Sequence, residues 1–156
     1  MPKIDFANAP VRTACAYPEP YADHCRGRSK IAVGDLGGLD QFGVNYTRLA
    51  PGAASAHKHW HAKEDELIYL IEGEAVLVED DGETILRAGD FASFKAGVAN
   101  GHMMVNRSHR DAVFLEVGTR SLDDVSTYTD PSVDMKMVKN GGAWRAYRKN
   151  DVPYGG

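Results

Sequence analysis

The chain has 156 residues, of which 43% are hydrophobic and 26% are charged, and its formal net charge at pH 7 is -4. A chain of this length forms one domain and buries a core without needing disulfide staples. The acidic balance excludes a basic surface suited to nucleic acid or to an anionic membrane. No stretch resembles a signal peptide or approaches the roughly 20 apolar residues that span a bilayer, so we expect a cytoplasmic protein without a membrane partner.

Residues 1–40 are expected to form an irregular arm packed on the domain, because they carry prolines at positions 2, 10, 18 and 20 and show no sustained period. The two cysteines of the chain, Cys15 and Cys25, both lie in this arm. Two cysteines near one end of a chain of this size give no disulfide framework. We therefore expect two reduced thiols, in keeping with a cytosolic protein.

From residue 42 onward, short apolar runs separated by turn residues predict β-strands. Asp81 and Gly82 form an Asp-Gly pair between two such runs and predict a β-hairpin. Runs of strand length at intervals of about ten residues, with little helical period, favour an antiparallel sandwich or barrel. The chain turns polar after Gly118, although residues 127–139 could hold a short strand or helix. The expected strands cover residues 42–50, 66–71, 75–79, 83–87, 91–94, 102–105 and 112–117.

A cluster of potential metal ligands begins with His57, His59 and His61, which occupy alternate positions. In an extended segment these side chains share one face, because side chains in a strand repeat every two residues. Glu66 follows five residues later, and His102 is a further histidine in another predicted strand. Imidazoles and a carboxylate that converge on one point are typical of a transition-metal site.

The segment from Gly52 to Gly73 resembles the first sequence motif of the cupin family. In that motif a glycine precedes His-x-His, three or four residues separate the histidines from a glutamate, and six residues lead to a second glycine. His59, His61 and Glu66 follow this spacing up to Gly73, although Gly52 lies one position further away than in the commonest form. His57 falls outside the spacing, and we expect it to be a solvated residue or to lie at the mouth of the site.

The segment from Gly89 to Asn106 resembles the second cupin motif, in which a glycine is followed by Pro-x-Gly, a histidine and, three residues later, an asparagine. Lys95 stands where the family usually has proline, and four residues rather than two separate Gly97 from His102. Proline there mainly stiffens a turn, so its loss costs little. Because of the longer loop, the register of His102 is less well determined by the motif than that of His59, His61 and Glu66.

The resemblance is to small single-domain bacterial cupins with a His-Trp-His and a Glu-Asp-Glu pattern, and it implies an all-β fold. This fold is a double-stranded β-helix, the jelly-roll barrel of the cupins. We expect the barrel core at residues 41–120, with residues 1–40 as the arm and residues 121–156 as a C-terminal extension that ends in a surface tail. The ligands of the family carry over to His59, His61, Glu66 and His102.

Such a set of three imidazoles and one carboxylate suits one divalent transition metal ion, and Zn, Ni, Fe, Mn and Cu are all candidates. Up to two open positions in octahedral coordination allow a substrate oxygen pair to chelate, with the metal as Lewis acid. We therefore expect an enzyme that acts on a small polar metabolite such as a sugar, a sugar phosphate or a hydroxy-acid, with no organic cofactor. The alternatives are a non-catalytic module that binds or senses a small ligand, an Fe-dependent dioxygenase and, third, a storage role.

Candidates for acid–base catalysis are polar side chains in or beside the predicted strands, and which of them face the barrel interior is open. Cupins of one domain commonly pair through edge strands and N-terminal arms, so the resemblance also implies a homodimer. The expected partner is a small molecule, with no nucleic acid. The candidate acid–base residues are Tyr46, Arg48, Tyr69, Lys95 and Glu116.

Overall fold

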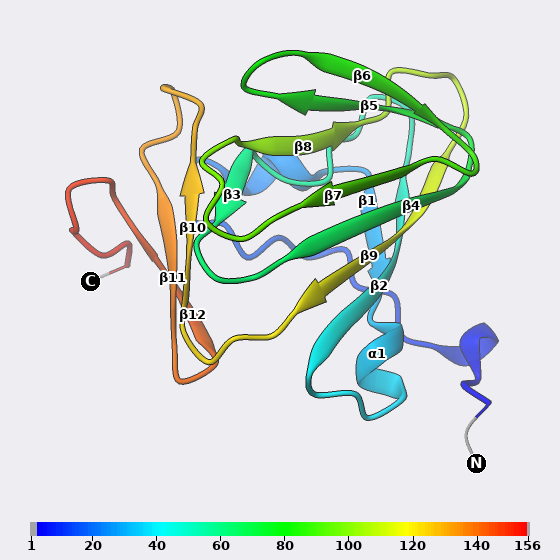
Figure 1. Cartoon of the computed structure of the whole chain (residues 1–156), viewed down its shortest axis with the longest axis horizontal. Helices are drawn as coiled ribbons and strands as arrows, with labels where there is room; N and C mark the ends of the chain where they lie inside the picture. The colour runs from blue at the N-terminus through cyan, green and yellow to red at the C-terminus, as the bar shows by residue number, and fades with distance from the viewer. Residues whose placement is uncertain (1–2, 156) are drawn as a thin grey trace.

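Two antiparallel β-sheets make up most of the molecule (Figure 1). The computed structural model describes residues 3–155, so Met1, Pro2 and Gly156 lie outside the described part. The five-stranded sheet consists, in spatial order, of β1 (Arg28–Ile31), β2 (Phe42–Leu49), β9 (Ala112–Thr119), β4 (Glu66–Glu72) and β7 (Phe91–Phe94). The seven-stranded sheet consists of β12 (Ala143–Tyr147), β11 (Lys136–Asn140), β10 (Asp124–Tyr128), β3 (His59–His61), β8 (His102–Val105), β5 (Glu74–Glu79) and β6 (Glu83–Arg87).

The hydrophobic core lies between the two sheets. Leu49 and Phe114 come from the five-stranded sheet and Met104 from the seven-stranded sheet, and all three are fully buried in one cluster. Burying apolar side chains of both sheets against one another is what holds such a two-layer fold together. Helical structure in the described residues is short: η1 (Phe6–Asn8), η2 (Ala22–Cys25) and α1 (Val33–Leu36). Within residues 3–155, no helix has the length and apolar character needed to cross a membrane.

Every strand expected from the sequence is present, with bounds that differ by at most two residues at either end. The predicted hairpin is formed by β5 and β6, which pair from Glu74 with Arg87 to Val78 with Glu83. The regular alternation of apolar and turn residues was therefore sufficient to place the barrel strands. The all-β prediction is confirmed.

The two ends of the chain contain more sheet than expected. Residues 28–31 lie in the expected irregular arm, but they form β1, which pairs antiparallel with β2 so that Ser29 lies opposite Arg48. The C-terminal residues form β10 to β12, and β10 extends the seven-stranded sheet by pairing with β3. β1 completes hydrogen bonds that would otherwise be left open at the edge of β2, and an open edge of this kind favours pairing.

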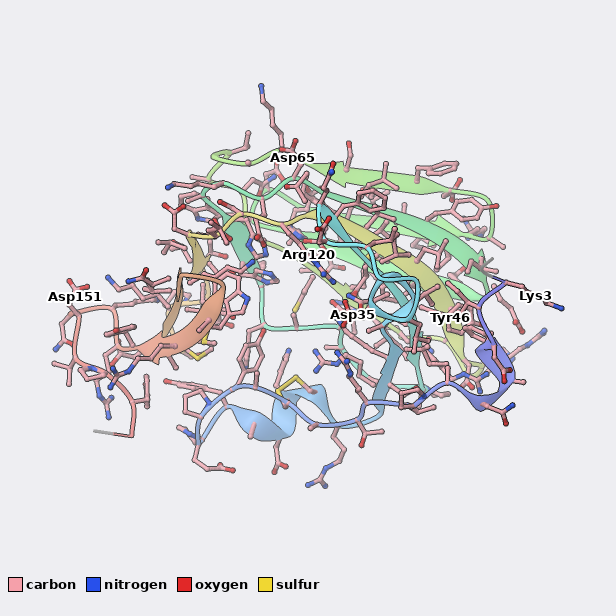
Figure 2. All side chains as sticks on the ribbon, turned by 90° about the horizontal axis from the view of Figure 1, so that it is seen from below. Lys3, Asp35, Tyr46, Asp65, Arg120 and Asp151 are labelled. Carbon is pink, nitrogen blue, oxygen red and sulfur yellow. A yellow bond between two sulfur atoms is a disulfide. The ribbon has the colours of Figure 1, made fainter. Side chains whose placement is uncertain are left out.

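The expectation of two reduced thiols is wrong, because Cys15 and Cys25 are joined in a disulfide. Figure 2 shows this bond in the N-terminal arm, which runs beneath the sheets in that view. The arm folds back on itself at η2, which brings the two Cα atoms to 5.9 Å, although ten positions separate the residues in sequence. The argument for a reducing compartment that rested on these cysteines no longer holds.

Breaking this disulfide is expected to lower the free energy of unfolding by about 2–3 kcal/mol, because closing a loop of this length restricts the unfolded chain by about that amount. Denaturant unfolding of the Cys15→Ser/Cys25→Ser double variant, compared with the oxidised wild-type protein, measures the difference. Thiol titration of the denatured wild-type protein provides the control. Two free thiols per chain after purification without reductant would contradict the assignment.

Candidate metal centre

The four residues predicted as metal ligands lie close together. His59 and His61 project from the same face of β3, and His59 pairs with His102 of β8 across the sheet. The ring centroids of His59 lie 5.0 Å from those of His61 and 5.3 Å from those of His102. Glu66, at the start of β4, places Oε2 3.1 Å from His102 Nε2. His102 therefore lies beside the other three residues, although the loop before it is longer than in the family motif.

The donor atoms are arranged around a space that fits a metal ion. Ligand atoms of His59, His61 and Glu66 all lie within 4.8 Å of one another. Nitrogen and oxygen donors bind a transition metal ion at about 2.0–2.2 Å, so donors on opposite sides of one ion lie about 4 Å apart. Only a small closure would therefore bring these atoms into coordination distance. The ring of Phe94 stacks on His102 at 3.5 Å with an interplanar angle of 2° and so restricts the plane of that imidazole.

Hydrogen bonds orient the two imidazoles of β3. His59 Nδ1 donates to the backbone carbonyl of His57 at 2.7 Å, and His61 Nδ1 donates to Asp124 Oδ2 at 2.6 Å. In both rings the tautomer with hydrogen on Nδ1 leaves Nε2 free to accept. Asp124 has a fully buried side chain, and its other oxygen accepts the Lys63 backbone N–H at 2.8 Å. A carboxylate behind a ligating histidine is the usual arrangement at metal sites.

The electrostatics of the cluster favour the protonation states that bind metal. Burial, helped by the nearby His61, lowers the pKa of His59 to about 3. Burial alone would raise the pKa of Glu66, but the hydrogen bond to His102 and the positive potential of the imidazoles lower it to about 2. At neutral pH, His59 is therefore neutral and Glu66 ionised, which are the forms that coordinate metal ions.

Two residues of the motifs without ligand atoms hold the scaffold in place. Gly73 has φ +80°, and a Cβ there would lie 2.4 Å from the carbonyl oxygen of Asp111. Only glycine fits such a left-handed and crowded position. Asn106 is fully buried and donates from Nδ2 to the carbonyls of Leu49 and Arg110 at 2.9 and 2.7 Å. Both residues thus fix turns around the strands that carry the ligands.

The ligand cluster opens into a cavity of about 440 Å³. A volume of this size suits a small organic ligand. A second cavity, of about 250 Å³, shares His61, Glu66 and His102 with the first. The residues with aromatic rings or charges that line the main cavity, apart from the cluster, are Tyr17, Arg28, Lys30, Glu64, Asp65, Glu116, Arg120, Tyr128, Lys139 and Trp144.

Two of the five acid–base candidates line these cavities. Glu116 of β9 lines the main cavity, is 8% exposed and lies 2.6 Å from the ammonium nitrogen of Lys30. Lys95 is an exposed residue that lines the second cavity. Glu116 is therefore the candidate that can reach a molecule bound in the main cavity.

The other three candidates lie outside both cavity linings. The ring of Tyr46, which Figure 2 labels, packs edge-on against that of Phe6 in the arm, with ring centroids 4.9 Å apart. Arg48 is exposed and pairs with Asp111, and Tyr69 packs against an aromatic ring of β7. These side chains project from the five-stranded sheet away from the ligand cluster.

His57 is packed beneath the arm rather than solvated. Its ring stacks on that of His24 at 3.7 Å with an interplanar angle of 15°, and its Nε2 lies 3.4 Å from the carbonyl of Tyr21. Burial, followed by the influence of His24, lowers the pKa of His57. His57 therefore joins the arm to the segment that precedes β3.

Several cavity residues had not been predicted, and they come from the two ends of the chain. Arg28 belongs to β1, and Ser126 and Tyr128 belong to β10. The alternation of Asp124, Ser126 and Tyr128 along β10, all buried, is a period of two that indicates an inward face. That face is polar, which made the strand resemble a solvated segment in the sequence.

The fold is a β-barrel that carries a cluster of potential metal ligands. The model for the "Cupin domain" family matches residues 45–118. A crystal structure of a sugar phosphate isomerase of the cupin superfamily from Silicibacter pomeroyi shares 41% identity, covering 97% of this chain and 96% of that one, with a TM-score of 0.93. The chain therefore belongs to the cupin superfamily, and the predicted jelly-roll barrel is confirmed.

More distant structures agree on the fold. A candidate sugar phosphate isomerase from Acidithiobacillus ferrooxidans shares 28% identity over 80% of this chain and 78% of that one, with a TM-score of 0.72. The polyketide cyclase RemF from Streptomyces resistomycificus shares 18% identity over 76% of this chain and 79% of that one, with a TM-score of 0.62, and shows the fold alone. No sequence among the curated proteins matches the chain.

Proposed function

We propose that this cupin is a metal-dependent enzyme that acts on a small polar metabolite through Lewis-acid chemistry. The observation that carries the proposal is a preorganised donor set at the base of a cavity of about 440 Å³. His59, His61, Glu66 and His102 would hold one divalent ion. The sugar phosphate isomerase activity named for the Silicibacter pomeroyi relative favours a sugar phosphate or a related hydroxy-carbonyl compound as substrate.

A bound divalent ion would polarise a carbonyl or hydroxyl oxygen of the substrate. The residues of the chain would supply proton transfer and orientation. Glu116 is a nearly buried carboxylate in the cavity wall and, with Lys30 beside it, is our candidate for exchanging a proton with the substrate. Burial, reinforced by Tyr17, raises the pKa of Tyr128, so its hydroxyl stays protonated and can donate a hydrogen bond.

The test begins with elemental analysis of protein purified without added metal. A screen of sugars, sugar phosphates and hydroxy-acids by thermal shift follows, and each hit is incubated with the protein for product analysis. We expect about one equivalent of a transition metal and a product that no longer forms after chelation and forms again when metal is restored. A ligand that binds but is recovered unchanged would favour the binding or sensing module instead, and oxygen consumption would favour the dioxygenase. A homodimer and a cytoplasmic location remain predictions, which light scattering and fractionation can check.

A further inference from the structure

One cation in the cavity wall lacks a counter-charge. Four cationic side chains line the main cavity, and three of them have a carboxylate partner. The pairs are Lys30 with Glu116, Lys139 with Glu64, and Arg120 with Asp35, the last visible in Figure 2. The fourth is Arg28, which makes no salt bridge with any residue of the described part of the chain, 3–155.

The guanidinium of Arg28 is held in place by neutral groups. Nη1 donates to the backbone carbonyl of Ser55, and Nη2 donates to that of Ala14 at 3.4 Å. These two bonds use two of the five N–H donors of an arginine. Arg28 is half-buried, so its charge is only partly stabilised by water. The side chain is thus positioned and retains donors and charge for another group.

Arg28, the ligand cluster and two tyrosines line the same cavity. The rings of Tyr17 and Tyr128 lie 5.5 Å apart, and that of Tyr128 lies 5.4 Å from His59. Burial raises the pKa of both tyrosines, and the positive charge of Arg28 opposes this effect in each. A molecule in the cavity can therefore contact both the guanidinium and the cluster.

The charges in the cavity favour an anionic molecule. The ion pairs Lys30–Glu116, Lys139–Glu64 and Arg120–Asp35 cancel. Asp65 also lines the cavity, but it is exposed, so water screens its charge. A divalent ion held by one carboxylate and three neutral imidazoles keeps a net positive charge, and Arg28 adds to it. In a partly desolvated cavity such charges attract an anion strongly. The planar fork of arginine matches the oxygens of a phosphate or a carboxylate.

We propose that Arg28 binds the anionic group, a phosphate or a carboxylate, of the small molecule that this cavity accepts. This inference rests on the proposed function, in which the rest of the same molecule reacts at the metal centre. It makes Arg28 a specificity-determining residue, because a neutral analogue of the same molecule would leave the guanidinium without its counter-charge.

The test uses the full chain and measures binding of inorganic phosphate and of acetate by calorimetry. Arg28→Gln is expected to weaken the tighter of the two anions at least tenfold, and Arg28→Lys less, because it keeps the charge without the fork. Arg145→Gln is the matched control, since Arg145 is exposed, lies outside the cavity and makes no salt bridge within residues 3–155. Tighter binding of phosphate or of acetate identifies the anionic group. Equal binding by wild type and Arg28→Gln would overturn the proposal and leave Arg28 as a support for the Ser55 and Ala14 carbonyls.

A second measurement does not depend on the folding of a variant. Phosphate should slow modification of Arg28 by phenylglyoxal in the wild-type protein, as followed by mass spectrometry, while Arg145 is modified at an unchanged rate. Absence of protection would overturn the proposal. The binding and protection measurements are both repeated on metal-stripped protein. Arg28-dependent anion binding that persists without metal supports this proposal even if no turnover is ever found, so the two proposals fail separately.

Discussion

Replacing His59 with alanine is expected to lower the affinity for metal more than about 100-fold, because loss of even an outer partner of a ligand costs about 10–100-fold. His59 is the central member of the cluster, with rings of His61 and His102 at 5.0 and 5.3 Å. Chelator competition and elemental analysis measure the effect. Glu66→Gln should behave in the same way, because an amide is a much weaker donor than the ionised carboxylate.

The matched control is His109→Ala, which removes an exposed imidazole that is no part of the cluster. This variant should keep the metal content of the wild-type protein. Circular dichroism of each variant separates loss of metal from loss of fold. Full metal content in a folded His59→Ala protein would place the metal elsewhere and would remove the basis of the proposed Lewis-acid chemistry.

Replacing Asp124 with asparagine is expected to lower metal affinity by about 10–100-fold while the fold is retained. Asp124 would be a positioning residue, since it accepts from His61 Nδ1 at 2.6 Å and from the Lys63 backbone N–H at 2.8 Å. The two donors face different oxygens of Asp124, and in asparagine one of these positions becomes an NH2 group, which donates and cannot accept. Chelator competition gives the affinity, and nitrogen chemical shifts of His61 should show a loss of the single tautomer.

Asp123→Asn is the neighbouring control, because Asp123 is exposed and, within residues 3–155, forms a salt bridge only with Lys63. The competing explanation is that His61, Glu64 and Asp124 hold a second ion, since their ligand atoms also lie within 4.8 Å of one another. A stoichiometry that falls from two equivalents to one in Asp124→Asn would contradict the positioning role. Unchanged affinity and tautomer would contradict it as well.

The barrel strands and the ligand cluster were predictable because their information is local. A strand shows its two faces in residues two apart, and His59 and His61 display this period directly. The spacing within the two motifs resembles that of the cupin family, and this resemblance identified Glu66 and His102 as further candidate ligands. The loop before His102 is longer than usual, yet pairing with β3 still determines where this residue lies.

The cavity could not be predicted to the same extent, because its remaining walls come from distant segments. Arg28 and Tyr17 lie in a segment whose prolines predicted an irregular arm, and Ser126 and Tyr128 lie in a strand with a polar inner face. Polar residues that face inward lose the apolar alternation by which a strand is recognised. The disulfide was not predicted for a related reason, since the residues between Cys15 and Cys25 carry no sign that the arm folds back.

The amino-acid sequence by itself determined the all-β class, the positions of the barrel strands and the identity of the four clustered residues. These depend on periods and spacings within short segments, and such patterns survive without knowledge of the rest of the chain. Only the tertiary structure decided which acid–base candidate lines the main cavity and which carboxylate orients His61. It also showed that, among the cations lining that cavity, Arg28 has no salt bridge within residues 3–155. Each of these depends on contacts between residues far apart in sequence, where burial and pairing of charge are set by packing.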